Sequence, residues 1–295
     1  MYYFISFSFY LLSLLPWRVL YVISDGIYVL VYYGMRYRRK VVMQNLLHAF
    51  PEKSEAERLV IAKEFYHNFI DTFIETIKLI SISEKELDKR FTTNIEVVND
   101  LYAAGRDVQM YTGHFFNWEV ANLGFSKQSK FPLVCVYLPL SSKAFNRVIV
   151  KLRVRYGSIM LSAYEFKNKF KDYVNGHYAL GLAADQCPSA PEKAYWLPFM
   201  NQMTPFYSGP EKGAKKNNMF CVFGHFYKVK RGYFKFEFEV MTLEPNQYET
   251  GKLTELYVAH LEKAIRKIPA NYLWSHRRWK WKYDAEKYGA MTVAQ

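Results

Sequence analysis

The chain has 295 residues, of which 51% are apolar and 23% charged, a composition typical of a folded protein and not of a disordered one. Its 40 Lys and Arg against 27 Asp and Glu give a formal net charge of +13, which fits an anionic membrane surface, a phosphorylated or acidic substrate, or nucleic acid. Nucleic acid is disfavoured because no zinc finger, RNP sequence or basic-region heptad accompanies the charge. Three widely spaced cysteines, Cys135, Cys187 and Cys221, form no disulfide framework or zinc ribbon and indicate a reducing compartment.

The first 35 residues are poor in charge and carry only Arg18 and Asp25. Pro16 separates two apolar runs, and a basic cluster follows them (Arg36, Arg38, Arg39 and Lys40). The start is not basic and no small-residue cleavage site is apparent, which disfavours a cleaved signal peptide. We therefore expect residues 1–35 to form a membrane-anchoring helical segment, with the basic cluster on the cytoplasmic side near anionic headgroups.

The arrangement of this segment is left open by the sequence. Each run is short for a span of about 20 residues, and the two together contain a proline and two charges. The segment therefore crosses the membrane at a tilt, kinks at Pro16, or lies in the interface. The alternative is an amphipathic helix that only packs on the rest of the protein.

A long amphipathic helix is predicted over residues 54–80, begun by a capping box of Ser54 and Glu57. Apolar side chains recur on one face at helical spacing, which predicts that this face belongs to the core (Ala62, Phe65, Phe69, Phe73 and Ile77).

Strand-like and helix-like segments then alternate. Strands are predicted over residues 108–112, 133–137 and 178–183, helices over 141–156, 164–175 and 249–267, and a hairpin over 219–229 and 233–241. This alternation indicates an α/β fold with a mixed, partly parallel sheet flanked by helices. We expect one catalytic domain, residues 36–282, followed by a C-terminal tail, residues 283–295.

The chemical centre is expected in the sequence Tyr111-Thr-Gly-His-Phe-Phe-Asn-Trp-Glu119, directly after a predicted strand. Gly113 allows a tight turn, so His114 would lie at the carboxyl end of that strand, where open α/β sheets bind ligands. Asn117 would cap the next helix and Glu119 would lie in its first turn. We expect Glu119 to fold back on the imidazole and orient it, which makes His114 a general base for a substrate hydroxyl.

The spacing alone is weak support, although His114 is the only one of the seven histidines with an acid five residues later. A loop histidine near an exposed acid would show the same spacing. A zinc protease motif is excluded because position 118, where the second metal-binding His would stand, is Trp.

This segment resembles the His-x4-Asp/Glu block of the lysophospholipid acyltransferase superfamily. Within that superfamily, the chain resembles the late (secondary) acyltransferases of lipid A biosynthesis, whose block Gly-His-Phe-x-Asn-Trp-Glu matches residues 113–119. Further matches extend the resemblance over residues 10–282; they are Asn45-Leu-Leu-x-Ala-Phe-Pro51, Arg153-x-Arg155-x-Gly157, Ala184-Asp185-Gln186, Leu197-Pro-Phe199, Thr204-Pro205, Gly209-Pro210 and Tyr272-Leu-Trp-x-His-Arg-Arg-Trp-Lys280. The chain departs from the family at Glu211, where a small residue is common, which puts the donor or acceptor pocket in doubt.

The resemblance implies further site residues. Arg153 would bind an acceptor phosphate or stabilise the carbonyl oxygen of the tetrahedral intermediate, and Arg155 competes for the same role. Asp185 would orient an Arg or a polar acceptor group, or would be only a turn carboxylate at a strand end. Asn117 is also expected to be a substrate-binding residue. The cluster of His276, Arg277 and Arg278, with its neighbouring Trp and Lys residues, suits a phosphate-rich headgroup or forms only an interfacial belt.

The resemblance implies an O-acyltransferase on the cytoplasmic face of the bacterial inner membrane. It would move a fatty acyl chain from acyl carrier protein to a hydroxyl of a lipid A precursor, the basic surface attracting the acidic carrier. No metal or cofactor is expected, because the thioester is already activated. An aminolipid or a lysophospholipid is the alternative acceptor, and a non-catalytic membrane-binding module is the alternative of another class.

Overall fold

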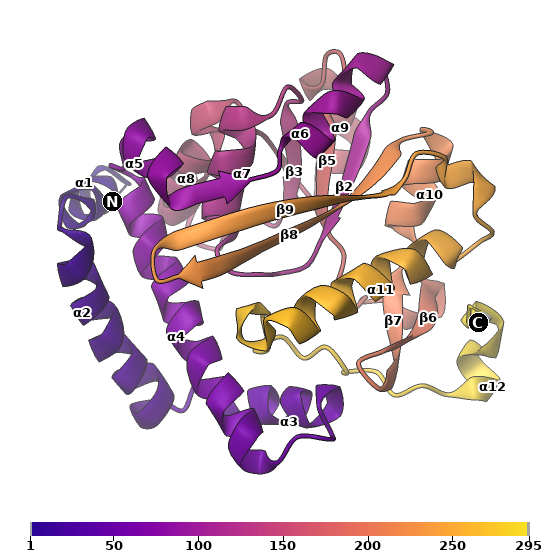
Figure 1. Ribbon diagram of the computed structural model, residues 1–295, viewed down its shortest axis with the longest axis horizontal. Helices are drawn as coiled ribbons and strands as arrows, with labels where there is room; N and C mark the ends of the chain where they lie inside the picture. Colours follow the sequence, from indigo (N-terminus) through magenta and orange to yellow (C-terminus); the bar gives the residue numbers. More distant parts are fainter. Residues whose placement is uncertain (1, 294–295) are drawn as a thin grey trace.

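A seven-stranded sheet forms the centre of the structure, a computed structural model that describes residues 2–293 apart from the side chain of Lys167 (Figure 1). The strand order is β1-β9-β8-β2-β5-β3-β4, and all neighbours pair in parallel except β8 and β9, which form an antiparallel hairpin. The strands are β1 (Phe91–Thr93), β2 (Val108–Thr112), β3 (Leu133–Tyr137), β4 (Ile159–Ser162), β5 (Ala179–Ala183), β8 (Phe220–Lys230) and β9 (Tyr233–Thr242). The prediction of a mixed, partly parallel sheet is confirmed, and most of its strand pairs are parallel.

Helices flank this sheet. They are α1 (Tyr2–Ser13), α2 (Trp17–Val29), α3 (Arg39–Ala49), α4 (Glu55–Leu79), α5 (Glu84–Arg90), α6 (Glu96–Asn99), α7 (Trp118–Gln128), α8 (Lys143–Arg153), α9 (Phe166–Tyr173), α10 (Gly209–Lys216), α11 (Lys252–Lys267) and α12 (Ala285–Tyr288). A π-helical turn, Leu30–Gly34, continues α2. In Figure 1, α7 lies above β8 and β9 and α11 lies below them.

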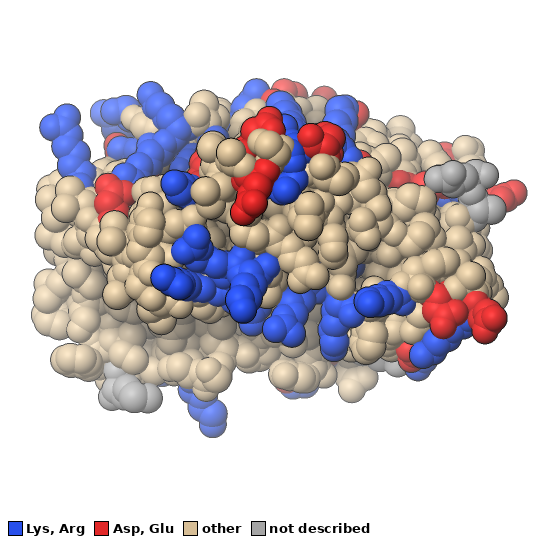
Figure 2. Space-filling model, turned by 90° about the horizontal axis from the view of Figure 1, so that it is seen from below, with Lys and Arg blue, Asp and Glu red and all other residues tan. Residues whose placement is uncertain are grey.

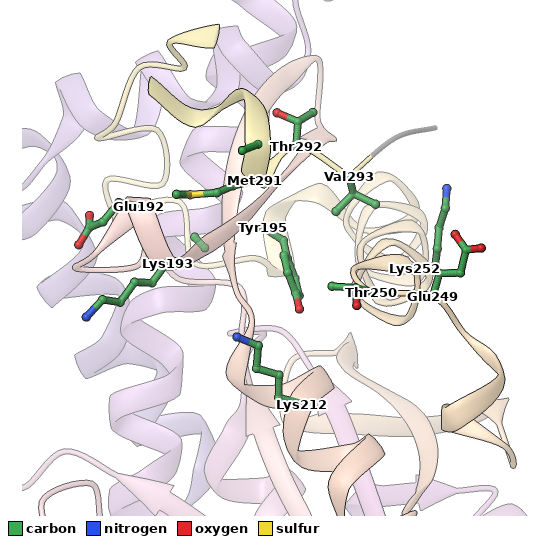
Figure 3. Close-up of a pocket in the computed structure, with 12 residues that line it drawn as sticks. Glu192, Lys193, Tyr195, Lys212, Glu249, Thr250, Lys252, Met291, Thr292 and Val293 are labelled. Atoms are coloured by element: carbon green, nitrogen blue, oxygen red, sulfur yellow. The ribbon is translucent and has the colours of Figure 1, made fainter. Parts of the chain in front are cut away.

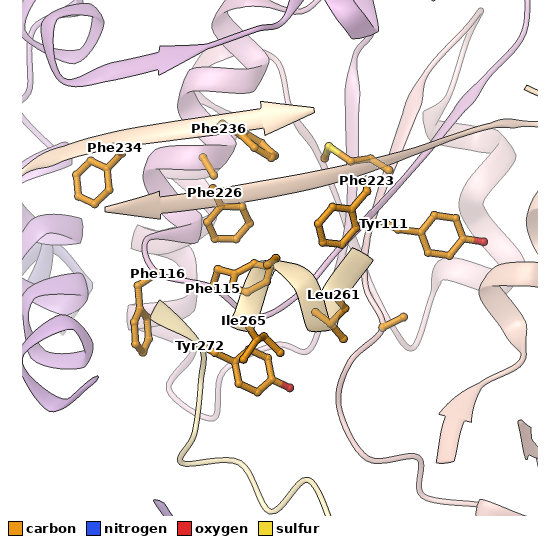
Figure 4. Close-up of a cluster of buried hydrophobic side chains, with 14 of the residues drawn as sticks. Tyr111, Phe115, Phe116, Phe223, Phe226, Phe234, Phe236, Leu261, Ile265 and Tyr272 are labelled. Carbon is orange, nitrogen blue, oxygen red and sulfur yellow. The ribbon is translucent and has the colours of Figure 1, made fainter. Parts of the chain in front are cut away.

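The hairpin strands carry aromatic side chains on both faces, because neighbouring strand residues point to opposite sides. Phe236 and Phe238 of β9 contact Phe125 of α7, whereas Phe223 of β8 contacts Tyr257 of α11. Figure 4 shows the buried cluster that results, with Phe223 and Phe226 beside the aromatic residues that follow β2. The sheet therefore has a core on each face.

Helix α4 begins as predicted, because the Ser54 and Glu57 side chains form the full capping box. The prediction that its aromatic stripe belongs to the core holds only in part. Phe65 is buried, but Phe73 is 48% exposed. The stripe therefore continues from the core onto the surface.

A second, two-stranded antiparallel sheet, β6 (Ala194–Phe199) and β7 (Gln202–Tyr207), was not predicted. Each strand contains a proline, Pro198 in β6 and Pro205 in β7, and proline argues against a central strand. In a two-stranded sheet both strands are edges, where proline is tolerated. The short strand β4 and helix α10 were also missed.

The N-terminal segment consists of two helices with Pro16 between them. No helix in residues 2–293 is by itself both long and apolar enough to span a bilayer. The pair formed by residues 2–13 and 17–34 has the length and composition only when taken together, and its axes differ in direction by 113°.

Candidate active site

His114 and Asp185 occupy equivalent positions beyond two neighbouring parallel strands. In the register of β2 and β5, Thr112 pairs with Ala183, and each of the two residues stands two positions further on. Carboxyl ends of parallel strands share one edge of a sheet, so the two side chains meet there. Gly113 is required in this turn, because a Cβ at this position would lie 2.7 Å from the Leu261 side chain and 2.9 Å from the Phe115 ring.

The Asp185 carboxylate holds His114 at two points. Its Oδ1 lies 2.6 Å from Nδ1 of the imidazole, and its Oδ2 accepts a 3.1 Å hydrogen bond from the backbone N–H of His114. The carboxylate is buried, whereas 29% of the His114 side chain is exposed. Because Nδ1 faces the carboxylate, the neutral imidazole carries its proton there and leaves the Nε2 lone pair free.

The electrostatics of the pair support this assignment. Burial alone would raise the pKa of Asp185, but the charge of His114 and the hydrogen bonds from His114 and Tyr272 lower it to about 2. For His114, burial alone would lower the pKa. The charge and the hydrogen bond of Asp185 outweigh this effect, and the pKa of His114 is raised above 6.5. The pair therefore favours an ionised carboxylate and a more basic imidazole.

Glu119, which was expected to orient the imidazole, contacts Arg153 instead. The Arg153 guanidinium donates from Nη2 at 2.6 Å and from Nε at 2.9 Å, a bidentate pair with a buried carboxylate. Glu119 lies in the first turn of α7 and Arg153 at the last residue of α8, so packing of these helices brings the two together. The structure thus separates two pairs, His114 with Asp185 and Glu119 with Arg153.

Asn117 caps α7, as predicted. Its Oδ1 accepts from the backbone N–H groups of Glu119 and Val120, and its Nδ2 donates to Glu75 on α4 at 3.1 Å. Glu75 also accepts from the hydroxyl of Tyr21 on α2. Burial and the neighbouring Asp71 raise the pKa of Glu75 to about 7, although the hydrogen bonds of Asn117 and Tyr21 oppose the rise. This buried acid was not predicted, and it links α2 and α4 to the start of α7.

Arg155 lies apart from these pairs. Its guanidinium donates to the carbonyl oxygens of Leu79 and Ile82 at the C-terminal end of α4. Cations at a helix C-terminus stabilise the helix, so this contact is structural. The sequence left Arg153 and Arg155 as competitors, and the structure brings only Arg153 to Glu119.

The expected headgroup cluster divides into three environments. His276 accepts the backbone N–H of Cys187 on Nε2, and burial lowers its pKa to about 4. Arg278 is buried against the Phe206 ring and donates from Nη2 to the carbonyl oxygen of Pro205. Only Arg277 is exposed. His276 is thus partly buried and Arg278 is buried, and the headgroup role expected for them stays a prediction.

Glu211, the departure from the family pattern, has a structural role. Its buried carboxylate accepts from the backbone N–H groups of Gly251 and Thr254 and from the Thr254 hydroxyl, at 2.7–2.9 Å. These groups form the first turn of α11, whose own cap residue is a glycine at φ 88° without a capping side chain. Glu211 therefore caps α11 from outside. Helix α11 begins at Lys252, three residues after the predicted start at about residue 249.

Two features of the surface lie outside these side-chain pairs, a group of basic residues and a cavity. Figure 2 shows Lys and Arg side chains gathered across the middle of one face. Arg38, at the start of α3, donates to the carbonyl oxygen of Ser275, two residues before the exposed Arg277. A cavity lies elsewhere, between β6, α10, the start of α11 and the C-terminal turn (Figure 3). His114 and Asp185 are not among its lining residues.

A partly exposed histidine bonded to a buried aspartate at the carboxyl edge of a parallel sheet, with one imidazole nitrogen free, is an arrangement suited to an enzyme that uses histidine as a base. Residues 1–281 match the family described as bacterial lipid A biosynthesis acyltransferase, and the chain belongs to this family. It is 25% identical over 276 residues to the "Lipid A biosynthesis lauroyltransferase" of Escherichia coli (strain K12), an alignment that covers 90% of this chain and 87% of that protein. The membership supports an acyltransferase that acts on lipid A, with a lipid as acceptor.

Proposed function

We propose that the protein transfers a fatty acyl chain from acyl carrier protein to a hydroxyl of a lipid A precursor, at the cytoplasmic face of the bacterial inner membrane, with His114 as general base. The observation that carries the proposal is the 2.6 Å contact between Nδ1 of His114 and Asp185, which leaves Nε2 as the basic nitrogen. Family membership supplies the reaction class and the lipid acceptor.

In the proposed reaction, Nε2 takes the proton of the acceptor hydroxyl as its oxygen attacks the thioester carbonyl carbon. The tetrahedral intermediate then collapses with cleavage of the carbon–sulfur bond, and the imidazolium returns the proton to the leaving thiolate. The products are an ester and a free thiol on the carrier. Asp185 stabilises the imidazolium that exists between the two proton transfers.

Glu119 is proposed as a positioning residue in this mechanism. Its bidentate contact immobilises the Nε and Nη2 edge of Arg153, and Nη1 has no hydrogen-bond partner within residues 2–293. A guanidinium held in this way can present its remaining donors to a phosphate or to the developing oxyanion.

The choice of acceptor is tested by mass spectrometry of lipid A from a strain that lacks the gene. We expect one secondary acyl chain to be missing, and to return with the wild-type gene but not with His114→Ala. Arg155→Ala is the matched control and should restore acylation, because within residues 2–293 the Arg155 guanidinium contacts the end of α4 and Tyr156 and not the proposed site. Unchanged lipid A in the deletion strain would refute this acceptor and favour the aminolipid or lysophospholipid alternatives.

A further inference from the structure

Within residues 2–293, exposed apolar side chains are concentrated on the outer surface of α1 and α2. Fifteen of the 28 large hydrophobic side chains exposed within residues 2–293 belong to residues 3–37. They include Phe4 and Phe7 on α1 and Val22 on α2. Such a surface, larger than the scattered exposed residues of ordinary soluble proteins, marks a site of contact with an apolar phase or partner.

Buried and partly buried polar contacts join the inner surface of α2 to the catalytic domain. Ser24 donates to Asp71 of α4 at 2.7 Å. Arg231, in the turn between β8 and β9, binds both Asp25 of α2 and Asp71, at 2.6 and 2.7 Å. Tyr21 reaches Glu75 on the same helix, α4. Because these contacts join α2 to two elements of the domain, α2 is an integral part of the fold.

The bend between α1 and α2 is held in the same way. Lys78 of α4 donates from Nζ to the carbonyl oxygens of Ser13 and Leu15, at 2.7 and 2.9 Å, and Ser81 donates to the Ser13 carbonyl. The Ser13 carbonyl is one that the end of α1 leaves without a helical partner, and the Leu15 carbonyl belongs to the turn between α1 and α2. The side chains of Lys78 and Ser81 therefore stabilise the 113° bend between the two helices.

A straight span through residues 2–34 would break the contacts that hold the bend. Helix α1 has 12 residues and α2 with its π turn has 18, or about 18 and 27 Å of rise, against a hydrocarbon core of about 30 Å. Only the two joined in line would cross with length to spare, and that requires straightening the bend and separating the end of α1 from Lys78 and Ser81.

We infer that α1 and α2 lie in the plane of the membrane surface, with their apolar outer faces among the acyl chains of one leaflet and their inner faces on the catalytic domain. The inference rests on the proposed membrane association and decides how the segment sits in it. The partner proposed for this apolar surface is a lipid bilayer.

The charges around the apolar surface fit an anionic bilayer. Arg147 of α8 lies over the Tyr2 ring at 4.3 Å, and Arg36, Arg38 and Lys40 are exposed just after α2. In Figure 2 the Lys and Arg side chains border an uncharged region to their left and below. Basic side chains beside an in-plane amphipathic segment contact anionic headgroups.

The inference predicts that Met1 and the catalytic domain lie on the same side of the membrane. The full chain is given a protease-cleavable tag at each end and is digested in inverted inner-membrane vesicles and in spheroplasts. We expect both tags to be cut in inverted vesicles and both to be protected in spheroplasts. An N-terminal tag cut only in spheroplasts would show a span and overturn the inference, while leaving membrane association intact. Recovery of all the protein in the soluble fraction would overturn both.

A matched pair of variants tests the surface itself. Leu11 on α1 is 48% exposed and Leu243, after β9, is 44% exposed, so Leu11→Glu and Leu243→Glu make the same change at similar exposure. Binding to vesicles of phosphatidylethanolamine and phosphatidylglycerol should fall on the order of tenfold for Leu11→Glu and stay unchanged for Leu243→Glu. Val22→Glu repeats the test on α2 if Leu11→Glu does not fold. Equal binding by all variants would refute the proposed surface.

Discussion

Replacing Asp185 with Asn separates the two carboxylates that the sequence offers as partners of His114. The variant removes a charge that lies 2.6 Å from Nδ1 and leaves the Glu119–Arg153 pair in place. In the wild type, the pKa of Asp185 is lowered from 3.8 to about 2, and the pKa of His114 is raised. Asn keeps the shape of the side chain, so the loss is mainly electrostatic.

The magnitude follows from these shifts. A lowering of roughly two pKa units corresponds to about 2–3 kcal/mol of interaction with the ionised carboxylate. This stabilisation is present above the unfolded pKa of 3.8 and is lost as the pH falls through about 2. At pH 5, where the carboxylate is ionised and the imidazole protonated, we expect the variant to unfold with a free energy lower by about 2 kcal/mol.

The effect on catalysis is larger. Loss of the orienting acid in a Ser–His–Asp triad lowers kcat by about 10⁴-fold, and we expect about 10³–10⁴-fold here. Activity requires the neutral imidazole, so its acid limb follows the pKa of His114; without Asp185 this limb should move to lower pH, because only the effect of burial remains. The assay is the pH profile of kcat for wild type, Asp185→Asn and Glu119→Gln. The reasoning is refuted if Asp185→Asn keeps both rate and limb while Glu119→Gln shifts the limb.

Four further variants test the surrounding framework. Arg153→Ala should lose about 3–5 kcal/mol of stability and most activity, because it leaves the buried Glu119 carboxylate without its charged partner and with only the Trp118 indole N–H as a donor. Arg155→Ala should lose about 1–2 kcal/mol and keep its kcat. Thermal melts and turnover check both. The buried Glu75 has a pKa raised from 4.5 to about 7, so the free energy of unfolding of the wild type falls by up to about 3 kcal/mol as the pH rises between these values. The Tm of Glu75→Gln minus that of the wild type should therefore increase from pH 5 to pH 8. A difference that does not change with pH would contradict this. Glu211→Ala should lower the free energy of unfolding in denaturant by about 2–3 kcal/mol and leave the turnover per folded molecule unchanged. A loss of turnover without a loss of stability would instead place Glu211 in a substrate pocket.

The sequence predicted the framework of the site better than its contacts. Local signals suffice for β2, the turn at Gly113 and the Asn117 cap, because each depends on neighbours within a few residues. The partner of His114 is 71 residues away and depends on which strands pair. A signal was nevertheless present, because His114 and Asp185 both follow buried strands by two residues, and parallel strands end at one edge.

Glu119 shows why spacing misleads. A carboxylate five residues after a histidine is close in sequence, but the first turn of α7 directs it to the end of α8. Phe73 shows a related limit, because helical periodicity places it in line with Phe65 but does not tell where the neighbouring elements end. In both cases the outcome is decided by packing between elements, which no local pattern contains.

The most direct test of the central claim is acyl transfer by the purified full-length enzyme, with acyl carrier protein thioesters as donor and a lipid A precursor as acceptor. We predict formation of the acylated precursor by the wild type and by Arg155→Ala, and its loss with His114→Ala although this variant still folds. Product formation by folded His114→Ala at the wild-type rate would contradict His114 as the base.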